Sequence, residues 1–452
     1  MSNADDKRII ISGAGLAGSL LAVMLARRGF EVTVYEKRAD MRRAEMSAGR
    51  SINLALASRG IKALLHADVM DRVKPLMLPM PGRMLHNREG ELKYQAYSRN
   101  PDEINYSVSR GELNKVLMDA AEETGRVKVL FEHAIEDMDF GSRTLVVRNE
   151  ETGETLTESG VPVLAADGAG SPVRKAMAEK LGITNSEDML DHAYKELTIP
   201  PADGGGYRIE KEALHIWPRG GFMLIALPNL DGSFTVTLFM AKEGENSFAS
   251  ITDGDTLRAF FQREFPDALE LIPDLETDFF NNPTGALGTV RSEPWHHEDI
   301  ACLVGDAAHA IVPFHGQGMN CAFEDCVEID ELLERHGTDW ARVFADYTKA
   351  RKRNGDAIAD MALENYVEMR ESVRDPRFHL KKELEFLLEG EMPDRFIPRY
   401  SMVMFHPEID YADAYERGRI QTGILEELLD DREDVATVDL DKAHELVKSR
   451  LG

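Results

Sequence analysis

Three glycines lie in a short segment directly after an apolar stretch near the start of the chain: Gly13-Ala14-Gly15-Leu16-Ala17-Gly18. This G-x-G-x-x-G pattern can bind the pyrophosphate of a dinucleotide. Gly13 permits a tight turn, Gly15 lets phosphate approach the backbone, and Gly18 lets the following helix lie close to a sheet. Glu36 follows 18 residues after Gly18, where a carboxylate can accept hydrogen bonds from a ribose diol. The pattern serves NAD and FAD alike.

A second glycine-rich segment could bind a flavin. It contains Gly305-Asp306-Ala307-Ala308-His309, then Pro313, then Gly316-Gln317-Gly318-Met319-Asn320. Asp306 at a strand end can bind a ribityl hydroxyl, and the later glycines let the backbone reach a flat ring edge. The helix that begins near Met319 can stabilise negative charge on a reduced flavin. A third segment, Ala166 to Arg174, contains the pair Asp167-Gly168.

The order and spacing of the three segments resemble the FAD motifs of the flavoprotein aromatic hydroxylases. The resemblance implies that FAD is the cofactor, that Asp167-Gly168 belongs to a motif associated with FAD and pyridine nucleotide, and that Arg110 contacts the flavin. The predicted cofactor-binding residues are Gly13, Gly15, Leu16, Ala17, Gly18, Glu36, Lys37, Arg38, Ala55, Arg110, Asp167, Asp306, Gly318, Met319 and Asn320.

Longer stretches, spread along nearly the whole chain, are similar to one family in this class, the kynurenine 3-monooxygenases. They include GRSINLALASRG (49–60), ALHIWPRG (213–220), MALENYVEM (361–369) and RFIPRYSM (395–402). The resemblance implies hydroxylation of L-kynurenine to 3-hydroxykynurenine with NADPH and O₂, through a C4a-hydroperoxyflavin. Hydroxylation of another aromatic acid is the alternative, and a flavin-binding sensor without turnover is the alternative from a different class.

The same resemblance implies a substrate site. Arg83 and Tyr97 would bind the substrate α-carboxylate, and Asn365 and Tyr400 would approach from a helical cap. A guanidinium offers a permanently charged clamp for a carboxylate, and Tyr and Asn add directional hydrogen bonds. An apolar box around the aniline ring is expected from Leu214, Met223, Ile225, Phe239 and Phe314.

The flavin itself would do the chemistry, and no residue is assigned with certainty as catalytic. His315 and Gln317 lie in the loop expected over the flavin, where they are candidates for hydrogen bonding the substrate carbonyl or amine. Stabilisation of the loop backbone is an equal alternative for His315. His309 is expected to be structural.

Composition excludes several classes of partner. The formal net charge is −27, and so acidic a surface repels nucleic-acid phosphates and anionic membranes. The three cysteines, Cys302, Cys321 and Cys326, form no C-x-x-C pair, and no zinc-ligand spacing is present, so we expect no metal. Without a signal peptide or an apolar run of about 18 residues, a cytoplasmic protein is expected. Monomer and dimer both remain open.

The strands and helices that position these residues can be predicted from changes in the spacing of apolar residues along the chain. A strand at 8–12, a helix at 16–29 and a strand at 31–36 form a β-α-β unit. Strand-like stretches at 194–200, 213–219, 222–228 and 233–240 lack intervening helices, which predicts an antiparallel sheet.

We therefore expect an α/β protein with a Rossmann-like FAD-binding lobe, an inserted antiparallel-sheet substrate lobe and a C-terminal helical cap. The predicted boundaries are 1–75, 101–185 and 285–340 for the FAD-binding domain, 76–100 and 186–284 for the substrate domain, and 341–452 for the C-terminal helical region.

Overall fold

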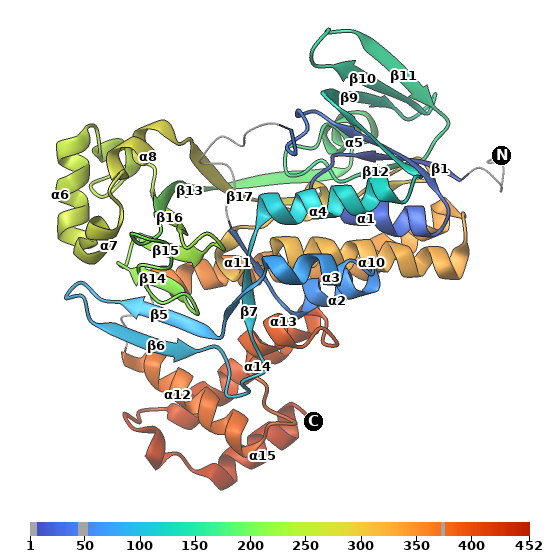
Figure 1. Ribbon diagram of the computed structural model, residues 1–452. Coiled ribbons are helices and arrows are strands. Elements are labelled where there is room, and N and C mark those ends of the chain that lie inside the picture. The colour runs from blue at the N-terminus through green and yellow to red at the C-terminus, as the bar shows by residue number, and fades with distance from the viewer. Residues whose placement is uncertain (1–6, 44–52, 372–375) are drawn as a thin grey trace. The chain divides into compact units, whose positions relative to one another are not determined.

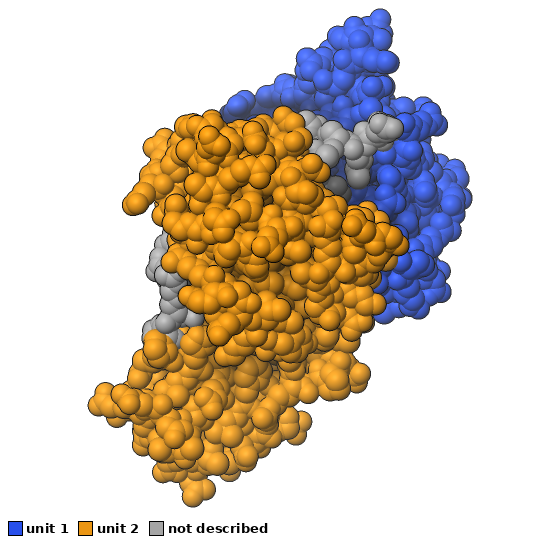
Figure 2. Space-filling model, turned by 60° about the vertical axis from the view of Figure 1, so that its left-hand side comes forward, with its two compact units in different colours: residues 1–77, 108–190, 288–359 blue, residues 78–107, 191–287, 360–452 orange. Residues whose placement is uncertain are grey.

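The computed structural model describes residues 7–43, 53–371 and 376–452, so the predicted stretch 49–60 begins outside the described residues. The chain forms two compact units, which Figure 2 shows in different colours. Unit 1 comprises residues 1–77, 108–190 and 288–359, and unit 2 comprises 78–107, 191–287 and 360–452. The assignment of separate functional domains at the boundaries given above stays a prediction.

The core of unit 1 contains a six-stranded sheet in the order β18-β19-β12-β1-β2-β8. The strands are β18 (His296–His297), β19 (Ala301–Leu303), β12 (Val163–Ala165), β1 (Arg8–Ser12), β2 (Glu31–Glu36) and β8 (Val127–Phe131). Strands β19, β12, β1, β2 and β8 pair in parallel, and β18 pairs antiparallel with β19. The carboxyl ends of the parallel strands therefore lie at one edge of the sheet.

The predicted β-α-β unit is present at the start of unit 1 (Figure 1). β1 is buried at Ile9, Ile10 and Ile11, as expected for an apolar strand of a parallel sheet. Helix α1 (Leu16–Arg27) returns the chain to β2, whose bounds are those predicted. The helix ends before the predicted residue 29, because Gly29 adopts a left-handed φ of 84°.

Unit 1 also contains a small antiparallel sheet in the order β11-β10-β9. It comprises β9 (His133–Asp139), β10 (Thr144–Asn149) and β11 (Thr155–Ser159). The two outer strands carry many charged and polar residues, which leaves their period-2 pattern weak.

Unit 2 is built on a seven-stranded sheet in the order β17-β13-β16-β15-β14-β5-β6. The strands are β17 (Thr284–Glu293), β13 (Thr184–Ile199), β16 (Phe234–Ala241), β15 (Met223–Pro228), β14 (Leu214–Pro218), β5 (Gly82–His86) and β6 (Leu92–Ala96). The predicted antiparallel pairing is found between β13 and β16, β15 and β16, and β14 and β15. β5 and β6, which were not predicted, also pair antiparallel. β5 and β14 pair in parallel. No short turn joins these two strands, so the connection between them does not require them to run antiparallel.

One face of this sheet carries the main core of unit 2. Trp217, Leu224 and Leu238 belong to a buried cluster with residues of three short helices. These helices are α6 (Gly254–Glu264), α7 (Pro266–Leu271) and α8 (Leu275–Asn281). Figure 1 shows them beside β13 to β16. Burial of such large apolar side chains stabilises the unit by roughly 1.5–3 kcal/mol per residue.

The C-terminal part of unit 2 is helical, as predicted, and has a second core. Its helices are α12 (Pro376–Glu391), α13 (Arg399–Phe405), α14 (Tyr411–Leu429) and α15 (Leu440–Arg450). Leu384 and Leu388 of α12 pack with Leu425 of α14 and Val447 of α15. None of the helices within the described residues has the length and apolar character needed to cross a bilayer.

The remaining elements connect these layers. They are β3 (Asn53–Leu56), α2 (Ser58–His66), α3 (Met70–Val73), η1 (Lys74–Leu76), β4 (Leu78–Met80), β7 (Asn105–Ser109), α4 (Arg110–Glu123), α5 (Pro172–Leu181), η2 (Phe248–Ser250), α9 (Asp306–His309), η3 (Pro313–His315), α10 (Gly318–His336), α11 (Trp340–Glu371) and η5 (Val435–Thr437).

Candidate active site

The predicted cofactor motifs of unit 1 lie at the carboxyl edge of its parallel sheet. In the register, Ser12 at the end of β1 pairs with Tyr35 of β2 on one side and Ala165 of β12 on the other, and Ala165 pairs with Leu303 of β19. Ser12, Tyr35 and Ala165 directly precede predicted cofactor-binding segments, and Leu303 lies two residues before Gly305. This edge is where open α/β sheets bind their ligands.

The glycine-rich turn after β1 has the geometry that a pyrophosphate needs. Gly13 has a φ of 93°, and a Cβ there would lie 2.7 Å from the carbonyl oxygen of Ala166. A Cβ on Gly18 would lie 2.0 Å from the carbonyl oxygen of Gly13. A Cβ on Gly15, by contrast, would meet nothing within 4 Å. Gly13 and Gly18 are therefore required by the fold, while Gly15 leaves open space at the start of α1.

Glu36 at the end of β2 is held against this turn. Its Oε2 accepts a hydrogen bond from the amide of Ala14 at 2.9 Å, and its Oε1 accepts one from the amide of Arg38 at 2.9 Å. Lys37 and Arg38 are exposed. A carboxylate fixed beside the phosphate turn fits the ribose-binding role predicted for it.

Asp167, the aspartate of the third motif, is linked to the turn through Ser12. The hydroxyl of Ser12 donates to Oδ2 of Asp167 at 2.8 Å, and Oδ1 is buried without a partner among the described residues. Burial raises the pKa of Asp167 above its usual value, against the opposing hydrogen bonds of Ser171 and Ser12. A buried carboxyl oxygen without a donor fits a site where a ligand supplies one.

The loop that contains Asp306 is buried except at Asp306 itself, which is exposed. Arg174 of α5 donates to the carbonyl oxygen of Ala307 at 3.0 Å, and Ser292 of β17 donates to that of Ala308 at 2.9 Å. Both carbonyls belong to the chain directly after Asp306. Arg174 is completely buried and thus ties the second motif to the helix that follows the third.

Helix α10 begins at Gly318, close to the predicted start near Met319, and the side chain of Asn320 binds the backbone of neighbouring segments. Its Nδ2 donates to the carbonyl oxygens of Ala55 and Gly316, at 2.9 and 3.0 Å, and its Oδ1 accepts from the amide of Ala57 at 3.0 Å. Asn320 thus holds the predicted residue Ala55 beside α10.

The other predicted residues of unit 1 differ in exposure. Leu16 and Ala17 are partly buried in the first turn of α1, and Arg110 is exposed at the start of α4. Phe314, His315 and Gln317 are buried, at 8%, 7% and 0% exposure. Asn114, which no sequence motif indicated, donates through its Nδ2 to the carbonyl oxygen of Ala14 at 3.0 Å.

All predicted substrate residues except Phe314 and His315 belong to unit 2, where three of them form one cluster. The guanidinium of Arg83 lies 5.2 Å from the ring centre of Tyr97 and 4.8 Å from that of Tyr400. The two rings stack on each other, 5.5 Å apart and 16° from parallel. Residues of β5, the segment after β6 and α13 therefore meet at one cation.

The charge states in this cluster are set by burial and by neighbouring side chains. Burial alone lowers the pKa of Arg83, but Tyr400, Tyr97 and Glu368 outweigh this effect and raise the pKa, so that the guanidinium stays charged. Burial raises the pKa of Tyr97, so that its hydroxyl stays protonated as a donor. Asn365 of α11 is buried at 9% exposure. Asn105, which the sequence analysis missed, donates to the hydroxyl of Tyr400 at 3.4 Å.

The predicted apolar residues of unit 2 share one face of the seven-stranded sheet with Arg83. Arg83 of β5 pairs with Leu214 of β14, and Met223 of β15 pairs with Phe239 of β16. Ile225 lies two residues from Met223, on the same face. The large core cluster uses the alternate residues and therefore lies on the opposite face.

The parallel sheet, the phosphate turn and the flavin-type loops define unit 1 as a dinucleotide-binding domain of the flavoprotein class, and the donors described above fit FAD. A family model described as "FAD binding domain" matches residues 6–362. The kynurenine 3-monooxygenase of Myxococcus xanthus is 49% identical over 451 residues, which cover 100% of this chain and 97% of the relative. That of Stenotrophomonas maltophilia is 48% identical over 422 residues, 93% of this chain and 91% of the relative. The chain thus belongs to the FAD-binding family of the kynurenine 3-monooxygenases.

Solved structures show the same fold at low sequence identity. The tetrameric form of 2-methyl-3-hydroxypyridine-5-carboxylic acid oxygenase has a TM-score of 0.65 at 19% identity, over 82% of this chain and 95% of that one. PqsL, a probable FAD-dependent monooxygenase from Pseudomonas aeruginosa, has a TM-score of 0.65 at 21% identity, over 82% of this chain and 99% of that one.

Proposed function

We propose that this protein is an FAD-dependent monooxygenase that hydroxylates L-kynurenine at ring carbon 3, with NADPH as reductant and O₂ as oxidant. The observation that carries the proposal is the placement of Arg83, with Tyr97 and Tyr400 around it, on the same sheet face as Leu214 and Met223. A charged clamp beside an apolar surface fits an aromatic ring that carries an amino-acid side chain. Full-length relatives named kynurenine 3-monooxygenase support the same substrate.

The residues of the chain have distinct tasks in this reaction. Arg83 binds the α-carboxylate, and the hydroxyls of Tyr97 and Tyr400 donate to it. Asn365 adds a further polar contact from α11. FAD, when bound, accepts hydride from NADPH and activates O₂. Gly15, Glu36 and Asp306 are the residues that would hold its phosphate, ribose and ribityl groups.

The main contribution of the protein to this reaction is to position the substrate ring. Carbon 3 of the ring lies ortho to the substrate's own amine and is already electron-rich, so orientation matters more than removal of a proton. The apolar face formed by Leu214, Met223, Ile225 and Phe239 orients the ring and excludes water. Exclusion of water limits loss of the activated oxygen as hydrogen peroxide.

An aerobic assay tests this proposal. With L-kynurenine, we expect NADPH oxidation to accelerate and 3-hydroxykynurenine to form in an amount equal to the NADPH consumed. NADH in a parallel reaction tests the choice of nicotinamide. Hydrogen peroxide as the only product would contradict the proposal, and hydroxylation of a different aromatic acid with a higher kcat/KM would favour the alternative substrate.

A matched ligand tests the role of the clamp. The decarboxylated analogue of kynurenine keeps the ring, the ketone and the amine but lacks the α-carboxylate. We expect the wild-type protein to bind it much more weakly than L-kynurenine, and Arg83→Met to reduce the difference between the two ligands. An unchanged preference in the variant would rule out Arg83 as the carboxylate ligand.

A further inference from the structure

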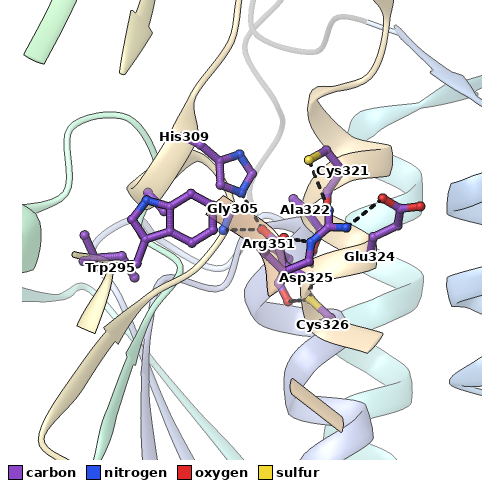
Figure 3. A network of polar contacts seen from close by, with 12 residues as sticks. Trp295, Gly305, His309, Cys321, Ala322, Glu324, Asp325, Cys326 and Arg351 are labelled. Atoms are coloured by element: carbon purple, nitrogen blue, oxygen red, sulfur yellow. Dashed lines mark hydrogen bonds and ion pairs between the residues drawn. The ribbon is translucent and has the colours of Figure 1, made fainter. Parts of the chain in front are cut away.

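A buried group of charges in unit 1 lies behind the Asp306 loop and is not used by the predicted chemistry. Asp325 of α10 is completely buried, and its carboxylate contacts three residues from two other segments, the Asp306 loop and α11 (Figure 3). Its Oδ2 accepts from the amide of Gly305 at 3.1 Å and from Nε2 of His309 at 2.6 Å. Its Oδ1 accepts from Nε of Arg351 in α11 at 2.7 Å.

These contacts hold both ends of the loop that presents Asp306. Gly305 precedes Asp306 and has a φ of 60°, and a Cβ at this position would lie 3.0 Å from the Cβ of Ala322 in α10. His309 ends α9, and its ring centre lies 4.9 Å from that of Trp295. The same carboxylate binds Gly305, directly before Asp306, and His309, three residues after Asp306. Movement of Asp325 must therefore displace the loop between these two residues.

The charge of Asp325 is balanced inside the protein. Burial by itself raises the pKa of Asp325, but the charges of His309 and Arg351 outweigh it and lower the pKa, so that the carboxylate stays ionised. Arg351 also contacts Glu324 at 3.1 Å, and Glu324 contacts the buried Arg59 of α2 at 2.8 Å. Of these two neighbouring carboxylates of α10, Asp325 thus holds the Asp306 loop and Glu324 holds α2, the helix that follows Ala55.

The cluster is not arranged as a metal site. His309, Cys321 and Asp325 each offer a ligand atom within 4.8 Å of the others. Arg351, however, donates to the Sγ of Cys321 at 3.3 Å as well as to Asp325. Burial raises the pKa of Cys321, which keeps it a thiol. The guanidinium therefore supplies the positive charge that a metal ion would otherwise bring.

We propose that Asp325 is a positioning residue for FAD: it fixes the backbone at Gly305 and the imidazole of His309, and thereby holds Asp306 where the ribityl chain binds. The proposal rests on FAD binding by unit 1 and is independent of the substrate. A hydrogen bond to a charged group contributes more to orientation than a neutral one, and Asp325 makes three such bonds within one buried site.

The test uses Asp325→Asn, which keeps the shape of the side chain and replaces one acceptor oxygen by a donor. We expect the dissociation constant for FAD, measured by flavin titration of the folded apoprotein, to rise at least about tenfold. The increase in Tm that saturating FAD produces should shrink accordingly. An unchanged dissociation constant would overturn the proposal.

Asp330→Asn is the matched control, because Asp330 is a second buried carboxylate of α10 with an equivalent set of partners. It binds Arg28 of the turn after α1 at 2.5 Å and His66 of α2 at 2.8 Å, so its ion pairs hold other segments than the Asp306 loop. We expect this variant to lower the Tm of the apoprotein while its affinity for FAD stays within about twofold of wild type. Equal loss of FAD affinity in both variants would mean that any damage to α10 has this effect, and would overturn the assigned role.

Arg351→Lys provides a second variant if Asp325→Asn does not fold. It keeps the positive charge but loses the guanidinium geometry that orients Oδ1 of Asp325. We expect a several-fold weaker affinity for FAD, and wild-type affinity in this folded variant would count against the proposal. The measurements that decide this proposal concern FAD binding and not hydroxylation. A wild-type protein that binds FAD but does not hydroxylate L-kynurenine would therefore refute the proposed function and leave this inference intact.

Discussion

Arg83 of β5 and Leu214 of β14 are direct neighbours in the register of the seven-stranded sheet. The pair joins a charged residue and an apolar residue on one sheet face, at the place where β5 and β14 run parallel. A substrate with a carboxylate at one end and an aromatic ring at the other would span this junction. The register is therefore the basis of the substrate proposal.

Replacement of Arg83 by Met should raise the KM for L-kynurenine roughly 10- to 100-fold, because a charge-assisted carboxylate contact is lost. FAD content should be unchanged, since Arg83 belongs to unit 2. Steady-state kinetics and the flavin absorbance of the purified protein measure both effects. Arg148→Met is the control, because Arg148 is a partly exposed residue of β10 whose ion pairs with Glu136 and Glu150 lie at the surface.

Removal of the Tyr400 hydroxyl by Tyr400→Phe should raise the KM roughly tenfold with little change in protein stability. The ring that stacks on Tyr97 is kept, and the change removes only the hydroxyl, which also accepts a hydrogen bond from Asn105. Tyr207→Phe is the matched control: its hydroxyl donates to the carbonyl oxygen of Asn229 at 2.9 Å, away from the Arg83 cluster. Equal effects of the two substitutions on KM would argue against a specific role for Tyr400.

The substitution Gly15→Ala should weaken FAD binding about tenfold or more while the apoprotein keeps its Tm. Gly15 has a φ of −72°, which alanine adopts freely, and the added methyl group meets no protein atom within 4 Å. The methyl group instead occupies the space through which phosphate approaches the backbone. Flavin titration and thermal unfolding separate the two effects. In the control Gly423→Ala, within helix α14, FAD affinity should stay unchanged and the Tm should rise slightly.

The free energy of unfolding should decrease as the pH is lowered from about 6.5 to 4, because a buried histidine of unit 2 has a lowered pKa. Burial is the main cause that lowers the pKa of His215 to about 4, and its Nδ1 lies 2.8 Å from Nε2 of the equally buried His86. The unfolded chain binds this proton at higher pH than the folded chain. Stability is therefore complete above pH 6.5 and decreases as the pH falls, by up to about 3 kcal/mol.

Urea unfolding at pH 7 and pH 4.5 measures this effect. His215→Gln removes the titrating group, and its loss of stability between these two pH values should be smaller than that of the wild-type protein. His444→Gln is the control, since His444 is exposed on α15. A pH dependence that is unaltered in His215→Gln would assign the effect to another group.

The cofactor half of the site was largely predictable because each of its motifs is local. A short apolar strand, a glycine turn and a helix follow one another within residues 8–27, so residue types alone define the turn that receives a phosphate. Three such motifs in family order then identified the flavin. The task of the Asn320 side chain was not predictable, because its partners Ala55 and Ala57 lie in a distant segment.

The arrangement of the substrate half of the site was less predictable, because it depends on tertiary structure. The apolar pattern of residues 213–240 predicts strands but does not tell which alternate set faces the core. The pairing of Arg83 with Leu214 and the packing of Trp217 and Leu238 against α6–α8 decide this. Tyr97 and Tyr400, far apart in the chain, meet only through that arrangement.

By itself, the sequence determined the cofactor class, the alternation of strands and helices and the family, since all three are written in residue types at short, fixed spacings. Tertiary structure alone decided the common face of Arg83 and the apolar residues, the parallel pairing of β5 with β14, and the buried contacts of Asp325. The physical reason is the same for all of these: they join segments that are remote along the chain, and their pairing is selected by packing and burial of charge, which no local pattern records.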